Sequence, residues 1–272
     1  MSFAPAGTST ATLRDQPTRV IAVTQDDPFF TGRFFASFIP ECVRTNVDLA
    51  EIVLLPNFDE SRAALVRRLL GFYGAIGFVR LLFRYGAAKV SDWRGAPRSV
   101  AAIAARKGVP VRSLRSINDP DYLATVHARG VDVLLSVSAP QIFTTDTLRA
   151  ARLALNVHTG KLPEYRGMMP TFWALANGDE HVTVTVHEMV QRLDAGPIVD
   201  EYDVRVEQGD TVFGLAARAK EIAGTRVARL LTHLDEEGRT SWRVPETSPG
   251  PPNRFPTKRD VQLLRSRGRR LL

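Results

Sequence analysis

The sequence predicts an α/β domain built on a doubly wound, mostly parallel sheet. Over residues 19–157, short apolar runs alternate with segments whose apolar residues recur at helical spacing. That alternation is typical of parallel strands joined by helices covering both faces of a sheet. With 272 residues, 44% of them hydrophobic, the chain can bury one large core. We expect this domain to be followed by a short C-terminal appendix.

The first half of the chain alternates strands and helices. Asp119 and Pro120 are typical of a helix start, and Gly108 of a helix end. Glycines at 71, 74, 77 and 86 divide the helical pattern of residues 60–90, which predicts two or three short helices. The apolar runs predict strands at residues 19–24, 49–55, 109–114, 131–137 and 153–157. Helical spacing predicts helices at residues 29–43, 99–107, 119–128 and 145–151.

Beyond residue 160 the pattern changes. Strict apolar–polar alternation predicts a strand at residues 182–187, and residues 196–206 read as another extended segment. A helix is predicted over residues 212–234, followed by a proline-rich, turn-like segment at 245–256. We therefore predict the following division: a flexible segment 1–18, a catalytic domain 19–235 with a basic insertion at about 60–98, and a C-terminal extension 236–272.

Charge is distributed unevenly along the chain. The formal net charge is +7, but residues 61–115 alone carry +11 and residues 254–272 carry +6, so the remaining residues sum to −10. We therefore do not expect a uniformly basic protein that coats nucleic acid. The single cysteine, Cys42, excludes a disulfide framework and a cysteine-based zinc site. With no signal-like segment at the N-terminus and no apolar run long enough to span a bilayer, we expect a soluble, cytoplasmic protein.

Polar side chains gather at the end of the predicted strand 153–157. Asn156 and His158 are two residues apart and share one face of that strand, and Asp194 lies in a Gly/Pro turn that can return to it. An amide, an imidazole and a carboxylate contain no nucleophile, so they suit a reaction whose nucleophile is the substrate. Acyl transfer to an amine fits: Asn156 stabilises the oxyanion, His158 moves protons and Asp194 raises the pKa of His158. No dinucleotide fingerprint, P-loop or nucleophile elbow is present.

Four motifs in order resemble the folate-dependent formyltransferase family. They are Asn156-Val-His158 leading through Tyr165-Arg166-Gly167 to Pro170, then Trp173-Ala-Leu-Ala-Asn177-Gly178, then Thr183-Val-Thr-Val-His187, and last Asp194-Ala-Gly196-Pro197. The resemblance implies a Rossmann-like formyltransferase fold and catalytic roles for Asn156, His158 and Asp194. It implies 10-formyltetrahydrofolate as co-substrate and no metal. Donor contacts are implied for Ser138, Gln141, Ile142, Gly160, Lys161, Leu162 and Pro163.

The chain departs from the family pattern at two places. Gly160-Lys161 stands where the family has Ser-Leu, which changes how donor or acceptor is held. Thr183 stands where the family usually has glycine, which narrows the space near the acceptor. His187 matches a family histidine, but a structural role is equally compatible with the pattern. His127, His181 and His233 are expected at the surface, and Trp173 in the core.

The acceptor remains open at this stage. We expect a small-molecule amine, either a nucleotide-linked amino sugar or a natural-product intermediate, and one that is anionic fits the basic segment. Glycinamide ribonucleotide formyltransferases have a Gly/Ser-rich phosphate loop after the first strand, whereas this chain has acidic, bulky residues 25–31. The alternatives are a methionyl-tRNA formyltransferase-like enzyme lacking the usual C-terminal domain and a non-catalytic folate- or nucleotide-binding relative.

The basic insertion admits three interpretations. Its arginines could hold an anionic acceptor, its helices could form a lid or a homodimer face, or its aromatic and basic residues could touch a membrane surface. The glycines interrupt the amphipathic pattern, so we expect no membrane contact, and we expect no nucleic acid partner.

Overall fold

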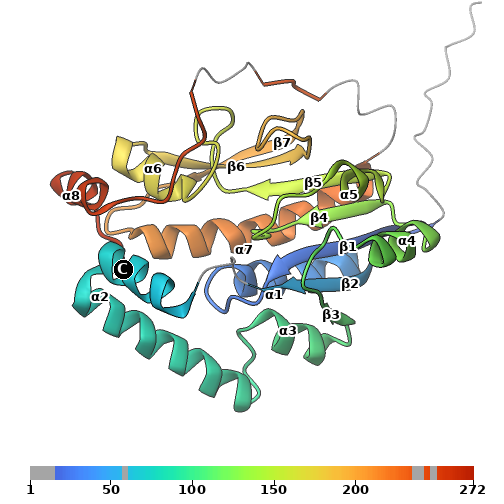
Figure 1. Cartoon of the computed structure of the whole chain (residues 1–272), viewed down its shortest axis with the longest axis horizontal. Helices are drawn as coiled ribbons and strands as arrows, with labels where there is room; N and C mark the ends of the chain where they lie inside the picture. Colours follow the sequence, from blue (N-terminus) through green and yellow to red (C-terminus); the bar gives the residue numbers. More distant parts are fainter. Residues whose placement is uncertain (1–15, 57–60, 235–241, 246–249) are drawn as a thin grey trace, which may run out of the picture.

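The computed structural model describes residues 16–56, 61–234, 242–245 and 250–272. Most of the predicted flexible segment 1–18, namely residues 1–15, lies outside the described residues, as do parts of the extension 236–272. Figure 1 shows one sheet with helices on both faces, which confirms the predicted fold class.

The sheet has seven strands in the order β3-β2-β1-β4-β5-β6-β7. Neighbours from β3 to β5 are parallel, whereas β6 is antiparallel to both β5 and β7. The pattern change after residue 160 thus marks a mixed edge on a mostly parallel sheet. The strands are β1 (Thr18–Gln25), β2 (Val47–Leu55), β3 (Val111–Ser113), β4 (Val133–Ser136), β5 (Leu153–His158), β6 (His181–Glu188) and β7 (Ile198–Arg205).

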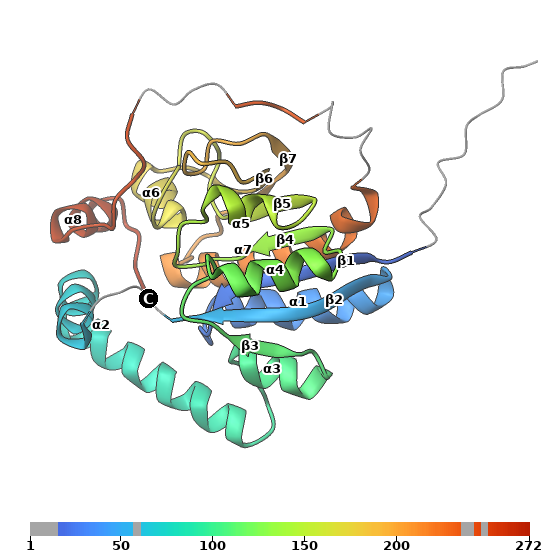
Figure 2. The ribbon, with the colours of Figure 1, turned by 45° about the vertical axis from the view of Figure 1, so that its right-hand side comes forward.

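Alternating side chains of the strands form two separate apolar clusters. Val20 and Ala22 of β1 pack with α1 (Thr31–Arg44) and α7 (Val212–Leu230) on one face. Ile21 and Val23 pack on the opposite face, which α4 (Pro120–Ala128) and α5 (Thr145–Arg149) cover (Figure 2). Period-two burial of this kind is what a doubly wound sheet requires.

Close packing of α1 against α7 depends on Gly224. A Cβ at that position would lie 2.3 Å from the backbone oxygen of Phe34, and the neighbouring Ser37 hydroxyl donates to the Glu221 carbonyl at 2.6 Å. The helix pair therefore contacts backbone to backbone beneath the sheet.

The capping predictions are confirmed. The Asp119 side chain accepts from the Tyr122 N–H at 3.0 Å at the start of α4, with Pro120 in the first turn. Gly108 ends α3 (Val100–Lys107) with φ of 70°, a conformation that glycine adopts without strain.

The insertion forms α2 (Arg62–Trp93), which is interrupted only at Gly74 (φ 72°, ψ 170°). Two helical segments result, as predicted, and the second is longer than expected because Gly77 and Gly86 remain helical. Figures 1 and 2 show α2 running along the outside of the molecule from the side of α8 toward α3.

The C-terminal segment packs back on the domain. Beyond α7, the described chain has a short 3₁₀ turn (Leu231–His233) and α8 (Lys258–Ser266), a helix the sequence analysis missed. The N–H groups of Val212 and Phe213 donate to the carbonyls of Arg270 and Leu271 at 2.9 and 3.0 Å. Among the described helices, none combines the length and apolar character needed to cross a bilayer.

Candidate active site

The candidate catalytic side chains lie on one face of the sheet where β5 ends. Asn156 and His158 share that face, since the intervening Val157 packs in the opposite cluster. On antiparallel β6, His187 pairs with Asn156 and Thr185 pairs with His158. The β6–β7 loop brings in Asp194, whose φ is 48°.

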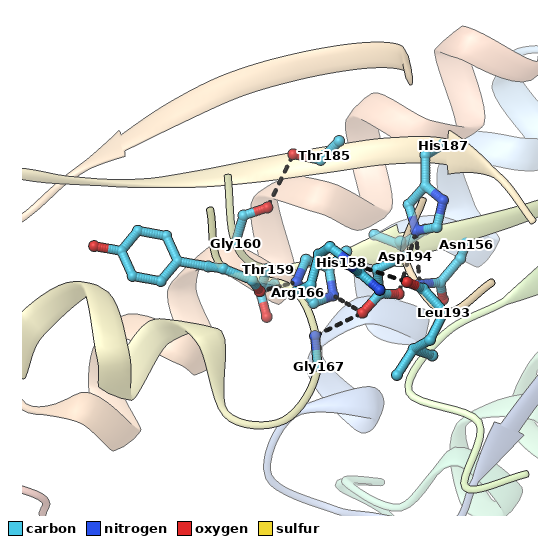
Figure 3. A network of polar contacts seen from close by, with 12 residues as sticks. Asn156, His158, Thr159, Gly160, Arg166, Gly167, Thr185, His187, Leu193 and Asp194 are labelled. Carbon is cyan, nitrogen blue, oxygen red and sulfur yellow. Dashed lines mark hydrogen bonds and ion pairs between the residues drawn. The ribbon is translucent and has the colours of Figure 1, made fainter. Parts of the chain in front are cut away.

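The structure brings Asn156, His158 and Asp194 together, as the sequence analysis expected (Figure 3). The Asn156 Nδ2 lies 3.1 Å from the His187 Nε2, which lies 3.6 Å from the Asp194 Oδ1. The other carboxylate oxygen, Oδ2, lies 3.8 Å from the His158 Nδ1 and accepts the Gly167 N–H at 2.8 Å. Both histidines therefore face one buried carboxylate.

The proton on neutral His158 is placed by a backbone contact. His158 Nε2 lies 2.7 Å from the Tyr165 carbonyl, which can only accept, so Nε2 carries the hydrogen. Nδ1, on the Asp194 side, is then the nitrogen that gains or loses a proton. Burial lowers the pKa of His158, and Asp194 and the Tyr165 carbonyl oppose that shift without reversing it. The expected contribution of Asp194, which raises the His158 pKa, is thus confirmed, but burial of the ring outweighs it.

Asp194 stays ionised although it is buried. Burial alone would raise its pKa, but His158, His187 and the Gly167 N–H together lower the pKa of Asp194 to about 2. The loop carrying it is fixed by the buried Arg166, whose Nε donates to the Leu193 carbonyl at 3.0 Å. A fixed negative charge therefore faces both imidazoles.

Gly160 lies between the candidate catalytic residue His158 and the start of α6 (Pro170–Asn177). A Cβ there would lie 2.4 Å from the Pro170 Cβ, 3.0 Å from the Tyr165 Cβ and 3.1 Å from the His158 Nε2. Its carbonyl accepts the buried Thr185 hydroxyl at 2.9 Å. In this structure, the loop at residue 160 lies so close to these three residues that a side chain there would require them to move.

Restoring the serine of the family pattern tests the packing. We expect Gly160→Ser to shift the loop and the His158 ring and to lower kcat/KM by about tenfold to a hundredfold, because catalysis is sensitive to displacements of about 1 Å. The measurement is steady-state formyl transfer together with a thermal melt. Gly71→Ser is the matched control, since a Cβ at Gly71 meets nothing within 4 Å; equal activity of both variants would contradict the packing argument.

The expected donor residues fall into two loops. Ser138, Gln141 and Ile142 follow β4, whose Ser136 pairs with Asn156. The Gln141 side chain accepts from the Ile117 N–H at 3.0 Å and donates to the Arg115 carbonyl at 2.7 Å. The Gln141 amide thus fixes the loop, whereas the Ile142 side chain is 75% exposed.

The second loop carries Gly160, Lys161, Leu162 and Pro163. Leu162 is completely buried and Lys161 forms an ion pair with Glu164 at 3.1 Å. Gly160 and Lys161 also line a cavity of about 460 Å³. Four carboxylates line it as well, from Asp179, Glu180, Glu201 and Asp203, and so does Thr183, whose hydroxyl donates to Asp203 at 2.6 Å.

Two buried groups near the site were missed as site residues. His187 was noted in the sequence, and its family match was the available signal. Lys220 of α7 gave no signal, because it sits alone on an otherwise apolar helix face. Its Nζ donates to the Val157 carbonyl at 3.1 Å, and burial lowers the pKa of Lys220 to about 8. This cation therefore contacts β5 at the residue between Asn156 and His158.

The remaining histidines and Trp173 lie where the sequence analysis placed them. His127, His181 and His233 are exposed. Trp173 packs partly buried against the core, with its Nε1 donating to the Arg254 carbonyl at 3.2 Å. In the described part of the chain, no group of three or more His, Cys, Asp or Glu side chains is arranged to hold a metal ion.

Comparisons with known proteins agree with the fold. Residues 88–230 match the family model described as Formyl transferase. The fold is similar to a glycinamide ribonucleotide transformylase from Symbiobacterium toebii (TM-score 0.57, 17% identity, 89% of this chain and 100% of that chain). It is also similar to a phosphoribosylglycinamide formyltransferase from Anaplasma phagocytophilum (TM-score 0.55, 19% identity, 82% of this chain and 93% of that chain). A third similar structure is a sugar N-formyltransferase from a Shewanella species (TM-score 0.52, 15% identity, 90% of this chain and 85% of that chain).

Proposed function

Because the chain belongs to the formyl transferase family, we propose that it transfers a formyl group from 10-formyltetrahydrofolate to the primary amine of a small molecule. The observation that carries this proposal is the convergence of half-buried Asn156 with buried His158 and Asp194 at the end of β5. It offers a hydrogen-bond donor, a titratable imidazole and a fixed carboxylate, so the amine of the acceptor supplies the nucleophile.

Each side chain has one task in this proposal. The Asn156 amide donates to the formyl oxygen as negative charge develops on it. His158 accepts the proton released by the attacking amine at Nδ1, the nitrogen that its Tyr165 contact leaves free. It returns this proton to the departing nitrogen of tetrahydrofolate as the bond between that nitrogen and the formyl carbon breaks. Asp194 lies 3.8 Å from that nitrogen and stabilises the imidazolium that forms.

The loops after β4 and β5 are the proposed donor contacts. The donor supplies the activated formyl group when bound. Ser138 has φ of 53°, and the Gln141 contacts hold the loop that follows in place. We assign donor recognition to the backbone of this loop and to Gly160, while buried Leu162, beside Pro163, shapes the second loop.

The loop after β1 argues against a phosphorylated acceptor of the glycinamide ribonucleotide type. The Asp27 carboxylate accepts the N–H groups of Phe29, Phe30 and Thr31 at 2.9, 3.1 and 3.3 Å, at the start of α1. Burial raises the pKa of Asp27 and these N–H groups oppose the shift. The amides that could hold a phosphate are thus already bound to the protein's own carboxyl group. We therefore favour an amino sugar or a natural-product amine.

An acceptor panel tests this assignment. The chain is mixed with 10-formyltetrahydrofolate and, in turn, nucleotide-linked amino sugars, glycinamide ribonucleotide and methionyl-tRNA, and tetrahydrofolate release is followed. We expect release with an amino sugar and only background with the other two. Faster release with glycinamide ribonucleotide would contradict the Asp27 argument. Donor binding without release for any amine would indicate a non-catalytic folate-binding protein.

A further inference from the structure

The second half of α2, residues 75–93, presents large apolar side chains to solvent. Their exposed fractions run from 47% at Val90 to 85% at Trp93. When several large apolar side chains are exposed on one surface, that surface is typically a contact with another molecule or with a membrane. The side chains are those of Ile76, Val79, Leu82, Phe83, Val90 and Trp93.

These side chains share one side of the helix. At 3.6 residues per turn they fall within an arc of about 120°. The opposite side carries Leu81 and the buried Ala88, which face the protein. Apolar residues thus occupy two opposite sides of one helix, and this hides the amphipathic pattern in the sequence. The glycines at 77 and 86, which argued against a membrane contact, stay within the helix.

Basic side chains flank the exposed apolar arc. Arg80 lies along one edge of it and Lys89 along the other, with Arg94 at the end of the helix. The only acid in residues 75–94 is Asp92, and its carboxylate accepts the N–H groups of Arg98 and Ser99. The face is therefore both apolar and cationic.

We propose that the exposed face of residues 75–93 binds an anionic lipid surface. The apolar arc enters the boundary between headgroups and acyl chains, and the flanking arginines and lysine contact anionic headgroups. A second copy of the chain fits less well, because pairing two such faces brings three basic side chains of each copy together.

The packing of α2 relates the proposed lipid-binding face to the candidate active site. Its Arg84 lies 4.7 Å above the Phe213 ring, and its Tyr85 ring lies 6.4 Å from Phe29 in the loop after β1. That loop follows the carboxyl end of a parallel strand, the edge at which β5 ends as well. The inner side of α2 therefore packs near the edge of the sheet that carries the candidate active site, and the proposed lipid contact is on the outer side of the same helix. The inference does not depend on which amine is formylated.

Vesicle binding by the full chain tests the proposal. Vesicles of phosphatidylcholine with roughly one third phosphatidylglycerol are compared with pure phosphatidylcholine, at low and at high salt. We expect sedimentation with the anionic vesicles, loss of binding at high salt, and quenching of Trp93 fluorescence by brominated acyl chains. The double variant Phe83→Ser/Trp93→Ser should bind at least about tenfold more weakly.

Matched variants separate this face from general stickiness. Val43→Ser removes an apolar side chain that is 81% exposed on α1 and should bind like the unmodified chain. Arg80→Glu/Arg94→Glu should weaken binding by about fivefold per charge removed or more. Equal binding to both vesicle types, or binding unaffected by the double variant, overturns the proposal. A failure to bind either vesicle type also overturns the proposal. If the double variant instead dissociates a dimer of the chain, the face is a contact between two copies, and the proposal is wrong in that case too.

Discussion

Replacing His158 with Asn lowers kcat/KM for formyl transfer by roughly 10³-fold while leaving the fold intact. Asn can still donate to the Tyr165 carbonyl, so the local hydrogen bond to that backbone survives. It cannot take up a proton, which leaves the attacking amine without a base on the Asp194 side. Steady-state kinetics and circular dichroism melts on the purified variant measure the two effects.

His127→Asn is the control for this substitution. His127 is an exposed histidine of α4, so its loss should change neither activity nor melting temperature. If the activity of the His158 variant stays within about tenfold of that of the unmodified chain, His158 does not transfer the proton.

Replacing Asp194 with Asn should lower kcat/KM to below about a tenth and shift the acid limb of the pH–rate profile. Asp194 raises the pKa of His158, so its loss lowers that pKa further, and the fall in activity on acidification moves to lower pH. Full pH–rate profiles for both proteins measure this shift, which a merely structural role of Asp194 would not produce.

Asp194 also links stability to pH. Its pKa is about 2 in the folded protein against an ordinary 3.8, so folding favours the ionised form. This contribution, about 2 kcal/mol, is fully present above pH 4 and is lost as the pH falls toward 2. In urea unfolding, the free energy of unfolding should fall as the pH falls across that range in the unmodified chain, and it should fall less steeply in Asp194→Asn. Asp121 is an exposed residue of α4, so the control variant Asp121→Asn should behave like the unmodified chain in urea unfolding. For the pH–rate profiles, an Asp194→Asn variant with full activity and an unchanged acid limb would contradict the role of Asp194 in tuning the His158 pKa.

The parallel part of the fold was predictable because its signals are local. The apolar run 19–24 and the Asp119–Pro120 helix start each specify an element through a few neighbouring residues, and the structure has both. Helix α8 was missed because its segment is highly charged, and only the Thr257–Asp260 capping box marks where it begins.

The site was predictable in its members more than in its electrostatics. Asn156, His158 and Asp194 were found from strand spacing and motif order, and they do converge. The net direction of the His158 pKa depends on how deeply the ring is buried, which spacing along the chain does not report. The Asp27 contacts with the start of α1 and the Lys220 contact with β5 likewise arise only when distant segments pack.

The most direct test of the account follows the formyl carbon itself. In a single turnover, the chain is mixed with 10-formyltetrahydrofolate labelled in the formyl group and with the acceptor amine found in the panel. The account predicts that the label appears on the amine at a rate roughly 10³-fold faster with the unmodified chain than with His158→Asn. Label released as formate at the same rate with and without the amine, in both proteins, would contradict it.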